Sequence, residues 1–193
     1  MFYVHGGRKM KVIEKLGIYF LILILAALIG GLYGILHDQI SYTLSNEYFT
    51  QLKFRQTRIP WAYESPRLGA AYIGFFAAWW MGVLVYSLLG CIGFMFKSPK
   101  LMAIHLTKSM LIVVGIAFVT GLVGLIYGYF QVNEITVVDS IQKVPANVNN
   151  PIQYLRVAYM HSASYIGGVT SLIAGSMYLI VSLVRYKQSN EIA

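Results

Sequence analysis

Charged residues are scarce in this chain of 193 residues. Asp, Glu, Lys and Arg make up 11% of it, whereas hydrophobic residues make up 58%. A soluble globular domain carries about 25% charged residues, so this composition excludes a disordered chain and most soluble enzymes. Cysteine is nearly absent as well. The single Cys91 excludes a disulfide scaffold and two-cysteine redox chemistry.

Asp, Glu, Lys, Arg and His are missing altogether from four long apolar runs, and about 20 apolar residues are enough to cross a bilayer. The predicted spans are residues 16–36, 68–96, 110–130 and 162–184. Two longer loops, residues 37–67 and 131–161, join the first span to the second and the third to the fourth. The sequence therefore predicts an all-α integral membrane protein, a four-transmembrane-helix bundle in a single membrane domain.

Acidic residues are few, which leaves a net charge of +8. In a soluble protein such an excess would suggest nucleic acid, but membrane proteins also concentrate Lys and Arg on the cytoplasmic side. Nine of the 15 basic residues lie in the two tails and in the loop between the second and third spans. We therefore predict a multi-pass protein of the inner (plasma) membrane with both termini cytoplasmic and no nucleic-acid partner.

Proline is rare, and three of the five prolines follow a residue that favours helix N-caps. These pairs are Ser65-Pro66, Ser98-Pro99 and Asn150-Pro151, each ahead of an apolar run. Proline is favoured at the first position of a helix, directly after the cap. We expect helices to begin at these prolines, so the fourth extends well beyond its apolar span.

The two halves of the chain share short motifs. Residues 30–34 resemble residues 124–128 at an offset of 94, and residues 71–74 resemble residues 164–167 at an offset of 93. Small residues also recur at every fourth position of the second and fourth spans, which favours close helix packing. The pattern predicts a duplicated helical hairpin, a parallel repeat about an axis along the membrane normal.

Four tyrosines fall at one depth if the halves are equivalent, namely Tyr33, Tyr72, Tyr127 and Tyr165. They fit the aromatic belt found at membrane interfaces. Alternatively, they line a shallow cavity that opens outward.

The first long loop predicts a short outer amphipathic helix from about residue 46 towards residue 58. Ser45 is a suitable N-cap, and Glu47 is favourable in the first turn. Such a helix lies on the membrane surface or caps the bundle. Arg55, Arg58 and Arg67 in this loop are candidate contacts to acidic partners or lipid headgroups.

Residues 37–49 read His-Asp-Gln-x-x-Tyr-Thr-x-x-x-Glu-Tyr-Phe. This stretch resembles one carried after the first span by a group of uncharacterised bacterial inner-membrane proteins. The resemblance covers these residues alone and implies no activity. The second long loop differs in character, because residues 135–138 are β-like and residues 145–150 are rich in turn formers.

A metal site is the best chemical candidate. His37 closes the first span and His161 opens the fourth, with Asp38 and Glu47 close to His37 in sequence. Imidazole with carboxylate suits zinc, iron or manganese. Against this, the sequence has no paired ligands at Glu-x-x-His or His-x-x-x-His spacing. The alternative is a set of interfacial histidines bonded to loop backbone or water.

Three functions fit these observations. We favour a non-catalytic interaction or accessory subunit of a larger membrane assembly, with other membrane proteins or a second copy as partner, because no catalytic constellation is apparent. The alternative is an outward-facing protein that binds a metal or small ligand through His37, Asp38, Glu47 and His161. The third is a passive small-molecule channel or carrier.

Overall fold

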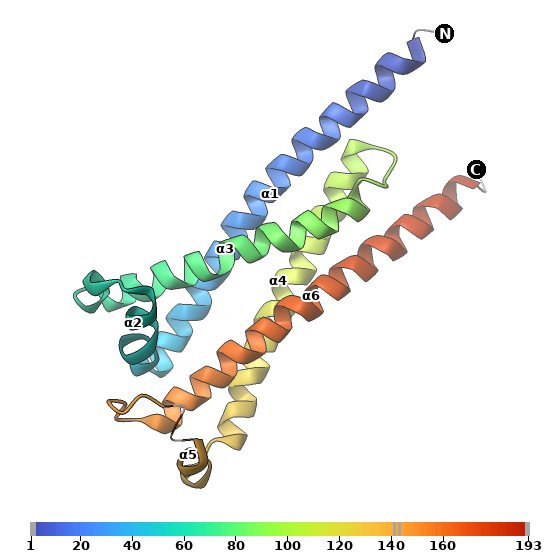
Figure 1. Cartoon of the computed structure of the whole chain (residues 1–193). Coiled ribbons are helices and arrows are strands. Elements are labelled where there is room, and N and C mark those ends of the chain that lie inside the picture. Colours follow the sequence, from blue (N-terminus) through green and yellow to red (C-terminus); the bar gives the residue numbers. More distant parts are fainter. Residues whose placement is uncertain (1–2, 141, 143, 192–193) are drawn as a thin grey trace.

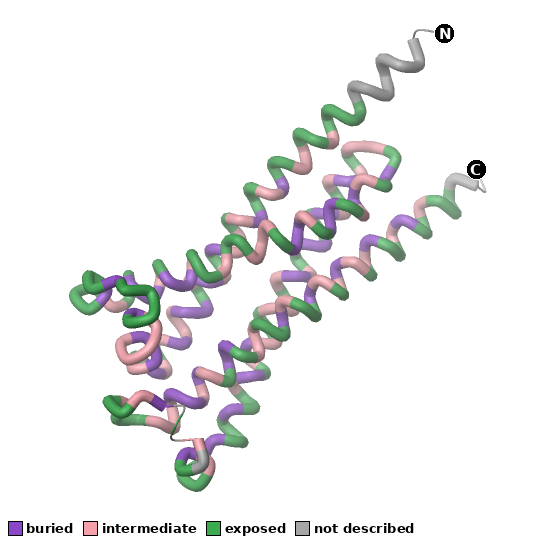
Figure 2. The backbone as a smooth tube through the Cα atoms, in the orientation of Figure 1, coloured by how far each residue is buried: buried purple, intermediate pink, exposed green. Residues whose placement is uncertain are grey.

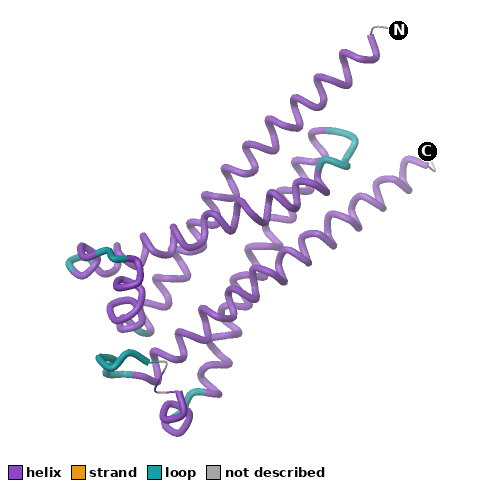
Figure 3. The backbone as a smooth tube through the Cα atoms, viewed as in Figure 1, coloured by secondary structure: helices purple, strands orange, loops and turns teal. Residues whose placement is uncertain are grey.

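The computed structural model describes residues 3–140, 142 and 144–191, with the side chains of 3–10, 139, 190 and 191 left aside. Throughout these residues the chain forms helices joined by short loops and contains no strand (Figure 3). The long helices are α1 (Tyr3–Leu44), α3 (Pro66–Gly93), α4 (Pro99–Gln131) and α6 (Pro151–Glu191). Each contains a segment long and apolar enough to cross a membrane. The predicted all-α class with four such helices is confirmed.

The helix starts follow the local sequence. α3, α4 and α6 begin at Pro66, Pro99 and Pro151, as predicted. Ser98 Oγ accepts the backbone N–H of Leu101 at 3.2 Å, and Asn150 Oδ1 accepts that of Gln153 at 3.1 Å. These side chains satisfy N–H groups that have no partner within the first helical turn.

α1 continues to Leu44, about two turns past the predicted end of its span. Polar side chains in this extension bond back to the helix. Ser41 Oγ donates to the carbonyl of His37 at 2.6 Å, and Thr43 Oγ1 donates to that of Gln39 at 2.8 Å. As a result, the histidine and the aspartate that follow the first span lie on a helix and not in a loop.

Glycines hold α1 against α3 and α4 against α6, which gives two antiparallel hairpins. A Cβ added at Gly34 would collide with the carbonyl of Gly74, and one at Gly124 would collide with Ala163. Such close backbone approach is typical of helix pairs in membranes. The termini and the α3–α4 turn lie at one end of the bundle, and α2 and α5 lie at the other (Figure 1).

Exposed residues occur along each of the long helices (Figure 2), and many of them are large and hydrophobic. Leu111 is 74% exposed and Phe130 is 81% exposed. A helix on the surface of a soluble bundle carries polar residues on its exposed face. The outside of this bundle therefore resembles its inside in polarity.

A compact segment between α1 and α3 covers the end of the bundle. It consists of a π-helical turn, η1 (Tyr48–Lys53), then α2 (Phe54–Thr57) and the 3-10 turn η2 (Pro60–Tyr63). Ser45 Oγ accepts the N–H of Tyr48 at 3.3 Å, so the predicted N-cap is present. Phe49 and Phe54 are buried in a core cluster that includes Tyr154 of α6. This packing fits the predicted placement as a cap on the bundle.

The β-like prediction for residues 135–138 is wrong, because these residues belong to the helix α5 (Glu134–Ser140). Asn133 and Thr136 exchange two hydrogen bonds at its start. The N–H of Thr136 donates to Asn133 Oδ1 at 3.0 Å, and the N–H of Asn133 donates to Thr136 Oγ1 at 2.9 Å. This reciprocal cap, together with burial of Val137, outweighs the strand preference of β-branched residues.

Candidate metal centre

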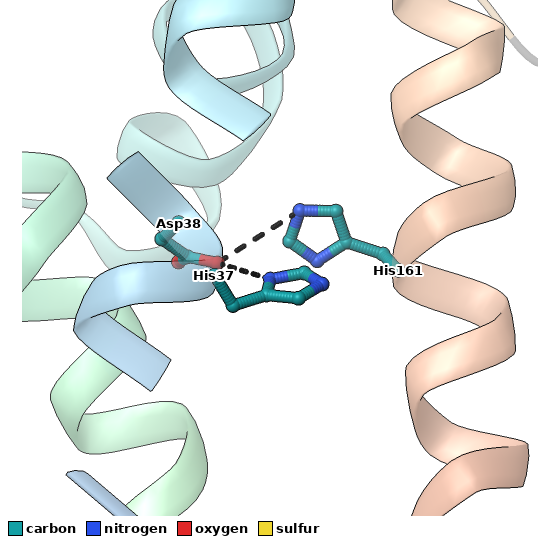
Figure 4. A group of neighbouring side chains, drawn as sticks. All are labelled: His37, Asp38 and His161. Atoms are coloured by element: carbon teal, nitrogen blue, oxygen red, sulfur yellow. Dashed lines mark hydrogen bonds and ion pairs between the residues drawn. The ribbon is translucent and has the colours of Figure 1, made fainter. Parts of the chain in front are cut away.

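Three predicted ligands meet at the end of the bundle opposite the termini. His37 and Asp38 project from α1, and His161 projects from α6 (Figure 4). One ligand atom from each lies within 4.8 Å of the others, and all three residues are buried. Asp38 Oδ1 is 3.0 Å from His37 Nδ1 and 3.9 Å from His161 Nε2. Bonds of about 2.0–2.2 Å from nitrogen and oxygen to one metal ion allow ligand atoms up to about 4.4 Å apart, so these three atoms lie near the spacing that one ion requires.

The second ring nitrogen of His37 is held by Ser164 of α6. Ser164 Oγ lies 2.9 Å from His37 Nε2 and donates to the carbonyl of Met160 at 3.0 Å. Both ring nitrogens of His37 therefore have a polar neighbour, with Ser164 Oγ at Nε2 and Asp38 Oδ1 at Nδ1. In the tautomer that carries its proton on Nε2, Nδ1 can bind a cation that it shares with the Asp38 carboxylate.

His161 is fixed by aromatic neighbours. Its ring stacks on Tyr48 at 4.7 Å between centroids and meets the His37 ring edge-on at 4.6 Å. His161 Nε2 is buried and has no hydrogen-bond partner. Leaving a buried polar atom unpaired costs about 1–3 kcal/mol. The nearest acidic atom is the Asp38 oxygen, so a shared cation gives both atoms a partner.

Lys53 of η1 is the positively charged neighbour of this cluster. Burial lowers the pKa of Lys53, and the charge of Asp38 opposes that shift. The ammonium lies 5.5 Å from the centroid of the Tyr48 ring. The positive charge of Lys53, in the segment between α1 and α3, therefore partly balances the negative charge of the Asp38 carboxylate.

Glu47 does not join the cluster, so the predicted set of four ligands is reduced to three. Its carboxylate oxygens accept the backbone N–H of Asn149 at 2.7 Å and that of Asn150 at 2.9 Å. Burial raises the pKa of Glu47, but these hydrogen bonds outweigh it and lower the pKa overall. Because α1 stays helical to Leu44, Glu47 is carried past the cluster to the start of α6.

The four predicted tyrosines do not form one ring. Tyr33 and Tyr165 line a cavity that adjoins the cluster, and Tyr165 is at the same time 65% exposed. Tyr72 and Tyr127 are exposed on the outside of the bundle. Tyr72 packs against Trp61 and Phe76, and Tyr127 packs against Tyr159. Residues at the same depth therefore point in different directions, because each helix presents a different face to the bundle.

The three predicted arginines are exposed near the same end of the bundle. Arg55 donates to Gln51 at 2.7 Å. Arg58 adopts the left-handed conformation, with φ of 53°, where α2 ends. Arg67 donates to Gln39 and Thr43 and lies over the Tyr42 ring. Arg67 is thus engaged within the chain.

Sequence reasoning assigned no role to Ser164, although one signal was available. Between the similar motifs at residues 71–74 and 164–167, Ser164 aligns with Ala71, so a polar residue stands where the other motif has a methyl group. If the two motifs are related by duplication, such a difference marks a candidate for a role that only one half performs.

Asp38, His37 and Ser164 also have the connectivity of a carboxylate–base–nucleophile triad. Acyl transfer additionally needs free N–H donors for a developing oxyanion. Ser164 lies well inside α6, where neighbouring backbone N–H groups belong to the helical ladder. The arrangement therefore suits metal coordination better than nucleophilic catalysis.

Comparisons of this chain with protein-family models, curated proteins and solved structures find no match.

Proposed function

We propose that this chain is a membrane protein that binds a divalent transition-metal ion through His37, Asp38 and His161. The observation that carries the proposal is the buried, unpartnered Nε2 of His161, which faces the Asp38 carboxylate 3.9 Å away. Two imidazoles and one carboxylate suit Zn²⁺, Fe²⁺ or Mn²⁺ and leave coordination positions open. The Ser164 contact to His37 supports it, because ligating histidines use their second nitrogen in a hydrogen bond.

The proposal places the cluster near the outer surface of the inner membrane, with both termini in the cytoplasm. The apolar outward faces support insertion, and the excess of Lys and Arg in the tails and the α3–α4 loop supports the orientation. The apolar lining of the central cavity favours a binding protein over a channel with a polar path.

We further propose that the two hairpins arose by duplication but carry a single site. At the offset of 94, His37 and Asp38 correspond to Gln131 and Val132. At the offset of 93, His161 corresponds to Leu68. The repeat-related positions hold no histidine or carboxylate, so one ion per chain is expected.

Metal analysis of the gently purified full-length protein tests the proposal. We expect one equivalent of metal, or of added Co²⁺ seen by its visible spectrum, in the wild type. His161→Ala should weaken binding by about 100-fold or more, since a ligand is lost. His105→Ala is the matched control, because His105 stacks on Phe96 and bonds Tyr178 outside the cluster.

A wild-type protein that neither retains nor binds metal would overturn the proposal, as would equal affinity in the two variants. Mass spectrometry of the same preparation tests the accessory-subunit role. A stable co-purifying membrane protein, absent from a control purification, would add that role to the metal site.

A further inference from the structure

A cavity of about 150 Å³ lies among the four long helices and ends at the metal cluster. Along α6 its lining runs from His161 to Ser171, and along α1 it runs from Ala26 to Asp38. Ten residues of helix rise about 15 Å. The cavity is therefore elongated along the bundle, with the cluster at one end.

The walls of this cavity are almost entirely apolar. Small residues such as Gly30, Ala78 and Gly168 supply much of the lining. Polar side chains gather at the cluster end, and Tyr86 and Ser171 lie towards the other. An apolar space of this size does not favour water, whereas its narrow, extended shape fits one hydrocarbon chain.

The polar end of the cavity determines which ligand headgroup can bind there. A divalent ion bound by one carboxylate and two neutral imidazoles keeps a net positive charge, and the ammonium of Lys53 adds to it. Lipid tails are as apolar as the cavity wall, so a chain gains little by leaving the bilayer. Affinity must therefore come from the head, and an anionic oxygen ligand fits the open positions of the ion.

We propose that the cavity binds a single-chain carboxylate amphiphile, a medium-chain fatty acid, with its head at the cluster and its tail between the hairpins. The inference rests on the proposed metal site, which holds the head. A saturated chain advances about 1.25 Å per carbon, so about twelve carbons fill the 15 Å length. Without metal, Asp38 repels the carboxylate, so binding should depend on the ion.

Paramagnetic broadening in phosphatidylcholine nanodiscs tests this orientation. The full-length protein is loaded with Co²⁺ and mixed with dodecanoate carrying ¹³C at either the carboxyl or the terminal methyl carbon. Because these carbons would lie about 3 Å and about 15 Å from the ion, the carboxyl signal should broaden at least tenfold more. The Zn²⁺-loaded protein, which is diamagnetic, should broaden neither signal.

The variant Gly168→Leu tests binding of the tail independently of binding of the head. A Cβ at Gly168 would meet only the flexible end of Met81, at 3.4 Å, so a larger side chain extends into the cavity. The position lies about 10 Å along α6 from His161. The variant should lose the dodecanoate effect and keep that of hexanoate. Gly115→Leu is the matched control, because a Cβ at Gly115 meets nothing within 4 Å and the residue does not line the cavity.

The outcomes separate the two proposals. A missing Co²⁺ spectrum in the wild type would overturn the metal site and this inference together. An intact spectrum with equal broadening of both carbons, or with unchanged dodecanoate broadening in Gly168→Leu, would overturn this inference alone. Stronger competition from a one-chain phosphate lipid of the same length would overturn the assignment of a carboxylate head.

Discussion

Glu47 and Asn150 join two parts of the chain that are 103 residues apart, through a hydrogen bond of 2.9 Å from the Asn150 N–H to Glu47 Oε2. A second bond, from the N–H of Asn149 to Oε1, lies beside it. Glu47 follows α1, and Asn150 directly precedes α6. The pair therefore fixes the entry of the helix that carries His161 relative to the helix that carries His37.

This contact predicts a pH dependence of stability. The hydrogen bonds place the pKa of Glu47 below its ordinary value of 4.5 in the folded protein. Stabilisation by the carboxylate is then complete above pH 4.5 and is lost as the pH falls through the lowered folded pKa. Glu47→Gln should flatten the acid side of the thermal-unfolding midpoint, whereas Glu64→Gln at an exposed site should not. Identical profiles for both variants would contradict the role of this contact.

Ser164→Ala should reduce metal affinity by about 10- to 100-fold, because it removes the hydrogen bond that orients His37. A competition titration with a chelator of known affinity measures the change. Ser162→Ala, two residues earlier on α6 and exposed, serves as the control. A similar affinity in both variants would show that the ring of His37 is positioned by other contacts.

Lys53→Met should tighten metal binding several-fold, because it removes a positive charge held near the cluster by the capping segment. Lys53→Arg retains that charge and should leave the affinity close to that of the wild type. Titrations at two salt concentrations add a second measure, since the gain should shrink as salt screens the charge. Weaker binding in Lys53→Met would instead assign Lys53 a packing role.

Gly34→Ala should destabilise the first hairpin by about 1–3 kcal/mol, because the added methyl group overlaps the backbone of Gly74. The shift in thermal midpoint in detergent measures it. Gly17→Ala on the same helix meets nothing within 4 Å and should be neutral or slightly stabilising. If Gly34→Ala is as stable as Gly17→Ala, the close approach of α1 and α3 is not needed.

The parts of the fold set by local chemistry could be predicted from the sequence. The three prolines, and the side-chain caps of Ser98 and Asn150, act within one helical turn, so the starts at Pro66, Pro99 and Pro151 are visible without tertiary structure. Ser65 precedes Pro66 without a side-chain capping bond. The β-like segment at residues 135–138 was predicted wrongly. Its composition favours a strand, but the reciprocal cap between Asn133 and Thr136 starts a helix there. The helix α1 continues past residue 36, the predicted end of the first span, because its polar residues bond back to their own helix.

The candidate site was only partly visible for a different reason. The residue types of His37, Asp38 and His161 suggested a metal, and their places near span ends suggested a shared membrane surface. Which side chains face one another depends on the rotation and packing of α1 against α6, and no local pattern encodes these. The same limit explains why Glu47 was included among the predicted ligands and why Ser164 was not expected near the site.

The cluster takes two residues from the first hairpin and one from the second, and this division has a consequence for assembly in the bilayer. Each hairpin contains its own close helix contacts, but neither alone supplies His37, Asp38 and His161 together. If each hairpin inserts as a unit and the cluster binds metal, as proposed, the ion would join the two hairpins afterwards, when helices already in the membrane associate laterally. Metal occupancy of the nascent protein would then report when the two hairpins associate.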